Sequence, residues 1–142
     1  MATRGFISHL DLNVSEPARS IASYGLVLEY LGFTRFDLDS PDRARWSVEY
    51  TTGSVLGIEI RPPRHRAPRN RHERYSPGID HLAFQADSRE DVDAVFGLLT
   101  DAGYEIAHPP AEYDYTPGYY AVALDDPDGI RLEVVHDPAT NP

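Results

Sequence analysis

Two histidines and two glutamates recur in the same order in the two halves of the sequence. His9 and Glu59 are separated by almost the same number of residues as His81 and Glu133. Imidazole nitrogens and carboxylate oxygens suit divalent Zn, Ni, Co, Mn or Fe, and a metal site with open positions acts as a Lewis acid. The four residues are therefore candidate metal ligands. The alternative is that they lie on strand faces turned toward water.

The elements that would position these residues also repeat. Each half has a strand with the histidine, then a helix, then three strands, the last of which carries the glutamate. In the first half the helix is expected to start at Ser15 and end at Gly32, and the expected strands are 6–14, 33–38, 45–51 and 55–61. In the second half the helix is expected to start at Ser88 and end at Gly103, and the expected strands are 79–86, 104–107, 119–124 and 130–135. A Pro- and Tyr-rich loop is expected at 109–118.

These patterns predict an α+β fold built from two tandem βαβββ modules. The first module takes residues 1–61, a Pro- and Arg-rich linker takes 62–78, the second module takes 79–136, and a short tail takes 137–142. One compact domain is expected overall, because 142 residues are ordinary for a single domain.

Composition excludes several classes of protein and site. The sequence has no cysteine, which rules out disulfides, thiolate metal sites and cysteine nucleophiles. Its formal charge of −10 disfavours nucleic acid as a partner, since neutralising phosphates requires a basic surface. The apolar stretches are too short to span a membrane, and no signal peptide is recognisable, so we expect a cytoplasmic protein.

Aromatic residues are the candidates for contact with a substrate. Four tyrosines lie close together before an expected strand, and Trp46 lies on a strand of the first half; the tyrosines are Tyr113, Tyr115, Tyr119 and Tyr120. Their flat rings and hydroxyl groups suit a ring-shaped or polyphenolic ligand. The alternatives are packing on the sheet edge or a dimer contact for the tyrosines, and ordinary core packing for Trp46.

The sequence resembles the vicinal oxygen chelate superfamily, which includes glyoxalase I, extradiol dioxygenases and bleomycin resistance proteins. The resemblance rests on the paired modules, the two His/Glu pairs and the segment 126–129 (Asp-Pro-Asp-Gly) shortly before the second glutamate, and it covers nearly the whole chain. It implies a curved, cup-like mixed sheet with the helices outside. It also implies a homodimer.

The resemblance implies two ligand sets. In glyoxalase I all four matching positions, His9, Glu59, His81 and Glu133, bind the metal, and Glu59 or Glu133 would remove a substrate proton. In extradiol dioxygenases the matching set is His9, His81 and Glu133. The positions that help bind glutathione in bacterial glyoxalase I are here Asn13 and Pro63. Lactoylglutathione lyase activity is therefore not expected.

The expected function is that of a divalent-metal-dependent enzyme of the glyoxalase or dioxygenase type. Its substrate would be a small molecule chelated through vicinal oxygens, in lyase, isomerase or dioxygenase chemistry. The alternative is a metal-free protein that sequesters an antibiotic, as in the bleomycin resistance branch, since an acidic protein with clustered tyrosines suits a cationic aromatic drug. The retention of all four ligand positions favours the enzyme.

Overall fold

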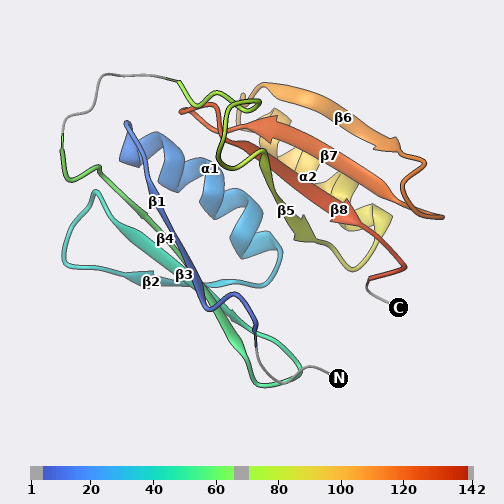
Figure 1. Cartoon of the computed structure of the whole chain (residues 1–142), viewed down its shortest axis with the longest axis horizontal. Coiled ribbons are helices and arrows are strands. Elements are labelled where there is room, and N and C mark those ends of the chain that lie inside the picture. Colours follow the sequence, from blue (N-terminus) through green and yellow to red (C-terminus); the bar gives the residue numbers. More distant parts are fainter. Residues whose placement is uncertain (1–4, 66–70, 141–142) are drawn as a thin grey trace. The chain divides into compact units, whose positions relative to one another are not determined.

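The computed structural model describes residues 5–65 and 71–140, and the chain divides into two compact units, Met1–Pro68 and Arg69–Pro142. We call them the first unit and the second unit. Each contains one four-stranded sheet and one helix (Figure 1). Parts of the expected linker (66–70) and tail (141–142) lie outside the described residues.

The first unit is a βαβββ module. Its elements are β1 (His9–Asn13), α1 (Pro17–Tyr30), β2 (Thr34–Asp37), β3 (Ala44–Glu49) and β4 (Val55–Arg61). The strand order is β1-β4-β3-β2. Only the β1–β4 pair is parallel, because the chain crosses over through α1 and two antiparallel strands before β4 returns beside β1.

The second unit repeats this topology. Its elements are β5 (His81–Gln85), α2 (Arg89–Asp101), β6 (Ile106–Glu112), β7 (Tyr120–Asp125) and β8 (Arg131–His136). The order is β5-β8-β7-β6, again with one parallel pair, β5–β8. The two tandem βαβββ modules predicted from the sequence are confirmed, as two separate four-stranded mixed sheets.

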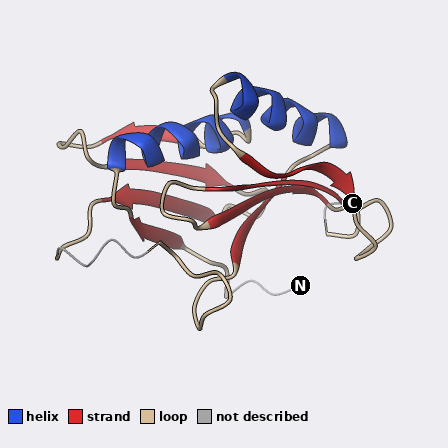
Figure 2. Cartoon of the chain, turned by 90° about the horizontal axis from the view of Figure 1, so that it is seen from above, coloured by secondary structure: helices blue, strands red, loops and turns tan. Residues whose placement is uncertain are grey.

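In each unit the helix covers one face of its own sheet (Figure 2). Under α1, the sheet buries Trp46, Ile58 and Ile60, each 1% exposed or less. Under α2, the sheet buries Val122, Leu124, Leu132 and Val134 completely. Since side chains alternate along a strand, the odd-numbered residues of β1, β4, β5 and β8 lie on the face that the helix does not cover. Neither described helix has the length and apolarity needed to cross a membrane.

The helix boundaries follow local capping chemistry. Ser88 caps α2 as predicted, with its hydroxyl accepting from the Asp91 N–H. The prediction of Ser15 as the cap of α1 is wrong: the N-cap residue is Glu16, without a side-chain cap, and Pro17 begins the helix. Proline suits that first position because it lacks an N–H that would need a partner. Both helices are followed by a glycine with positive φ, as predicted.

Strand β6 is the main departure from the predicted elements. It runs from Ile106 to Glu112, whereas the sequence predicted a strand at 104–107 and a loop from Pro109. Strand β6 tolerates two prolines because it is an edge strand with register shifts. At such positions the N–H that proline lacks is not needed by a carbonyl of a neighbouring strand. The expected tail begins as an ordered segment, since Asp137 is buried and accepts a hydrogen bond from the Thr116 hydroxyl at 2.7 Å.

Candidate functional site

His9 and Glu59 lie on the same face of the first sheet. In the parallel β1–β4 pair, His9 is opposite Gly57 and Asp11 is opposite Glu59, so the imidazole and the carboxylate are diagonal neighbours. This is the face that α1 leaves uncovered. The His9 side chain is exposed, and its Nδ1 lies 3.1 Å from the Ser8 hydroxyl.

Glu59 is already bound to an arginine. The glutamate is buried, with 6% of its surface exposed, and its Oε1 accepts hydrogen bonds from both Nε (3.0 Å) and Nη2 of Arg43. Arg45 lies farther away, with its Nε 3.9 Å from Glu59 Oε2. A buried carboxylate needs a counter-charge, and here the Arg43 guanidinium supplies it.

His81 and Glu133 repeat the arrangement in the second unit. In the parallel β5–β8 pair, His81 is opposite Arg131 and Ala83 is opposite Glu133, so the histidine and glutamate are again diagonal neighbours on the uncovered face. Each unit thus places one imidazole and one carboxylate at equivalent positions of its sheet.

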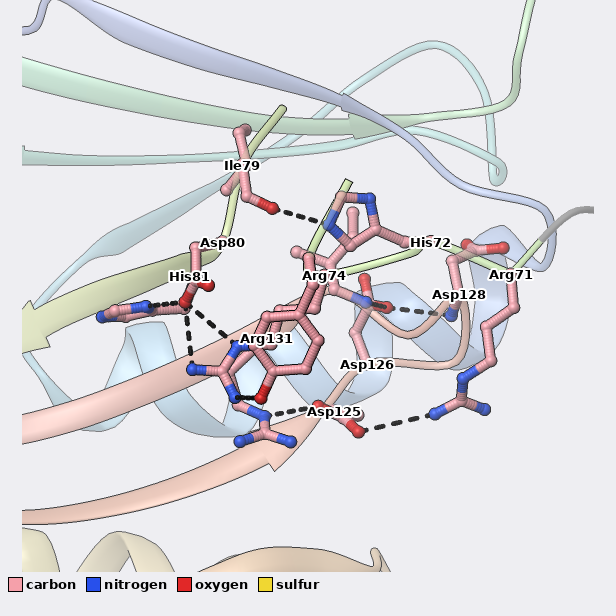
Figure 3. A network of polar contacts seen from close by, with 12 residues as sticks. Arg71, His72, Arg74, Ile79, Asp80, His81, Asp125, Asp126, Asp128 and Arg131 are labelled. Atoms are coloured by element: carbon pink, nitrogen blue, oxygen red, sulfur yellow. Dashed lines mark hydrogen bonds and ion pairs between the residues drawn. The ribbon is translucent and has the colours of Figure 1, made fainter. Parts of the chain in front are cut away.

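Asp80 contacts the ring of His81, and Arg74 in turn holds Asp80 (Figure 3). The Nδ1 of His81 lies 2.6 Å from Asp80 Oδ1, and Arg74 Nε donates to the same oxygen at 3.0 Å. Hydrogen bonds from His81 and Arg74 lower the pKa of the Asp80 carboxyl, so Asp80 is ionised at neutral pH. An ionised carboxylate accepts the Nδ1–H, which leaves Nε2 as the basic nitrogen of the ring.

Glu133 has a neutral partner instead of an arginine. The Tyr119 hydroxyl donates a hydrogen bond to Glu133 Oε1. Burial and this hydrogen bond raise the pKa of Tyr119 well above its ordinary value, so the phenol stays protonated. A neutral phenol supplies no counter-charge to the Glu133 carboxylate.

Three of the four candidate tyrosines gather beside Glu133. The rings of Tyr113 and Tyr115 stack with centroids 5.7 Å apart, and Tyr119 meets Tyr115 edge to face at 5.2 Å. They line a groove of about 280 Å³ formed by residues 112–119. The Tyr115 ring is 74% exposed and offers a free apolar face.

Tyr120 and Trp46 lie on the opposite faces of their sheets. The Tyr120 hydroxyl donates to Asp93 of α2. The Trp46 ring is fully buried under α1, and its Nε1–H donates to Glu29. Strand alternation is the cause, since each is an even-numbered residue on a strand whose odd-numbered residues share the histidine and glutamate face. Neither residue belongs with the candidate ligands.

The donor groups of each unit decide whether it could hold a divalent metal ion. Within residues 5–65 and 71–140, no three His, Asp or Glu side chains gather into a group that could hold a metal. The second unit still offers the His81 Nε2 and the Glu133 carboxyl group, which are donor types that suit such an ion. In the first unit His9 fits, whereas Glu59 would have to exchange its Arg43 hydrogen bonds for the metal.

Sequence reasoning missed Arg43, Arg74 and Asp80. Asp80 directly precedes His81, and that adjacency is the one signal that could have identified it. Arg43 precedes β3 and is distant in sequence from Glu59, so only the β3–β4 pairing brings the two together. Nothing in the sequence marks Arg43 among the other arginines.

The chain is similar to known proteins over most of its length. The family model described as Glyoxalase/Bleomycin resistance protein/Dioxygenase superfamily matches residues 6–134. The uncharacterised protein YqjT of Bacillus subtilis is 32% identical over 133 residues, which are 89% of this chain and 95% of that protein.

Solved structures share the fold. A protein from Bacillus halodurans matches with a TM-score of 0.71 and 28% identity, covering 94% of this chain and 97% of the other. A glyoxalase/bleomycin resistance protein from Albidiferax ferrireducens matches with a TM-score of 0.68 and 25% identity, covering 92% and 98%. Lactoylglutathione lyase from Agrobacterium tumefaciens, at 18% identity and a TM-score of 0.63 over 97% and 98%, is similar in fold alone. With a family model spanning nearly all of it, this chain belongs to the glyoxalase/bleomycin resistance protein/dioxygenase superfamily.

Proposed function

We propose that this protein is a divalent-metal-dependent enzyme that acts on a small molecule bound through two neighbouring oxygen atoms. The observation that carries the proposal is the repeated placement of one imidazole and one carboxylate on the uncovered face of each sheet. One nitrogen and one oxygen ligand within a unit leave coordination positions open for substrate.

The proposed ligands are His81 and Glu133 in the second unit and His9 in the first unit. Glu59 is left out because Arg43 donates two hydrogen bonds to its buried carboxylate. Glu133 is included because its partner is a neutral phenol. The resemblance to extradiol dioxygenases implies these three residues, and on that ground we propose dioxygenase chemistry. When bound, the metal would polarise the oxygen atoms of the substrate.

Residues of this chain would prepare the site. Asp80 holds the His81 ring with Nε2 available, and Tyr119 holds one oxygen of Glu133 so that the other remains available. The exposed Tyr115 ring would pack on an aromatic substrate, consistent with the flat apolar surface that the tyrosine cluster offers. We further propose a catechol or a similarly oxygenated ring as the substrate class.

The test is a measurement of metal content in purified, tag-free protein. The wild type is stripped with chelator and loaded in turn with ferrous iron, manganese, nickel and zinc. We expect about one ion per chain, lost in a His81→Ala/Glu133→Ala double variant. The matched control is His108→Ala/Glu105→Ala, which removes the same residue types from exposed positions of the second unit and should keep the metal. Loaded protein is then assayed with catechols, 2-oxoaldehydes and epimerisable thioesters.

The metal-free alternative rests on the Arg43–Glu59 pair. A glutamate whose charge an arginine already balances needs no metal ion. If wild-type protein takes up no metal under any loading, the enzyme proposal fails. Binding of a cationic aromatic antibiotic by the unloaded protein would then support the sequestering function instead.

A further inference from the structure

The two units differ at a pair of positions that the shared topology makes equivalent. In the second unit, the residue opposite His81 is Arg131, and it forms an ion pair of 2.5 Å with Asp125 on the next strand (Figure 3). In the first unit, the residue opposite His9 is Gly57, and the residue beside it on the next strand is Ser47. Two large charged side chains in one unit are thus replaced by two small residues in the other.

A groove of about 390 Å³ opens where the side chains are small. Gly57 and Ser47 line it, and so do His9, Phe36 and Val55. Phe36 and Val55 are 48% and 53% exposed, which is unusual for side chains of their kind. The groove volume falls in the range of ordinary small-molecule sites, and exposed apolar walls with a few polar groups are typical of such sites.

Arg45 is the charged side chain that lines this groove. Its Nε lies 3.9 Å from the Glu59 carboxylate, which is beyond hydrogen-bond distance. Glu59 is instead held by Arg43, which makes two hydrogen bonds to it. The Arg45 guanidinium therefore has donor groups available in the groove. This positive charge is notable in a chain whose formal charge is −10.

We propose that the groove binds a small monocarboxylate with an aromatic or aliphatic body. The planar guanidinium of Arg45 matches a carboxylate, to which it can donate two parallel hydrogen bonds. The Ser47 hydroxyl is a further donor on the same side of the groove. Phe36 and Val55 contact the apolar body of the ligand. The inference goes beyond the proposed function, because it names a carboxylate-binding groove that lies within the first unit.

The experiment measures binding by titration calorimetry with chelator present, so that no metal takes part. The probes are benzoate, the neutral analogue benzyl alcohol, and inorganic phosphate. We expect the wild type to bind benzoate in preference to both. Arg45→Gln should weaken benzoate binding by about tenfold to a hundredfold, the range for losing a charge-assisted contact. The control Arg19→Gln removes the same charge from an exposed position on α1 and should leave binding unchanged.

A second variant tests the groove apart from its charge. Gly57→Val adds side-chain volume to the groove at a strand position, where a β-branched residue is tolerated, and should abolish benzoate binding. Circular dichroism and urea unfolding show whether each variant folds.

Several results would overturn the inference. These are no benzoate binding by the wild type, equal binding by Arg45→Gln and Arg19→Gln, and equal affinity for benzoate and for benzyl alcohol or phosphate. Metal content is measured in the same variants, and Arg45→Gln should retain the metal. Benzoate binding without any metal uptake would refute the proposed enzyme and leave this inference standing, while metal uptake without benzoate binding would do the reverse.

Discussion

The contrast between the two glutamates gives the sharpest test of the site. Glu59→Gln and Glu133→Gln are the same chemical change at equivalent positions of the two sheets. We expect opposite consequences. Glu59→Gln should destabilise the fold and leave metal affinity intact, whereas Glu133→Gln should remove metal binding and destabilise the fold less.

The magnitudes follow from the contacts of each carboxylate. Glu59 is 6% exposed and receives two hydrogen bonds from a guanidinium, and hydrogen bonds to charged groups contribute about 1.5 to 3 kcal/mol. The Arg43 side chain is 45% exposed, which places the expected loss near the lower limit, at about 1.5 kcal/mol. Glu133 receives one hydrogen bond from a neutral phenol, and the amide can still accept it, so the loss should be below about 1 kcal/mol.

Two assays separate the effects. Urea unfolding in chelator measures the free energy of unfolding without metal, and calorimetric titration with manganous or ferrous ion measures metal affinity. For Glu133→Gln we expect metal affinity to fall by at least a hundredfold, because a proposed anionic ligand is lost. The reasoning is refuted if Glu59→Gln weakens metal binding as strongly as Glu133→Gln. That outcome would return Glu59 to the ligand set.

Three further predictions concern the second unit. Tyr119→Phe should lower metal affinity by about tenfold, the lower limit for losing a hydrogen-bond partner of a ligand, and the exposed Tyr115→Phe should not, as measured by the same titration. Arg131 lowers the pKa of Asp125 below its unfolded value of about 3.9. The ion pair therefore stabilises the fold above that pH. Its contribution is lost as the pH falls through the lower pKa of the folded state. Asp125→Asn should therefore flatten the acid side of the stability profile, measured by unfolding between pH 2 and 7, and an unchanged profile would contradict it. Gly103→Ala should lower the free energy of unfolding by about 1 to 2 kcal/mol, because φ is +81° there. Gly97→Ala inside α2 should raise it by up to about 1 kcal/mol. Equal effects of the two substitutions in urea unfolding would refute the argument.

Local rules explain which elements were predicted correctly. The bounds of β4 are those expected, and Ser88 caps α2, because strand alternation and helix capping depend on neighbouring residues. Strand β6 was predicted too short because prolines normally interrupt a strand. Whether a proline is tolerated depends on the position of the strand in the sheet, and the sequence of the strand does not contain that information.

Part of the candidate site could be predicted from the sequence, and part could not. The pairing of His9 with Glu59 and of His81 with Glu133 could be predicted, because a period of two and a repeated module place each pair on one face. Core packing was one of the two interpretations of Trp46, and the buried ring confirms it. Periodicity alone could not decide between them, because it predicts alternation but does not tell which of the two faces receives the helix.

The sequence by itself determined the two-module architecture and the family, since both follow from residue order and from short-range patterns. Only the tertiary structure shows which side chains the four candidate ligands contact. Arg43 reaches Glu59, Tyr119 reaches Glu133, and Gly57 lines a groove at the position where the second unit has Arg131. These contacts join residues that are distant along the chain, and burial and charge balance at such contacts set the chemistry of a side chain.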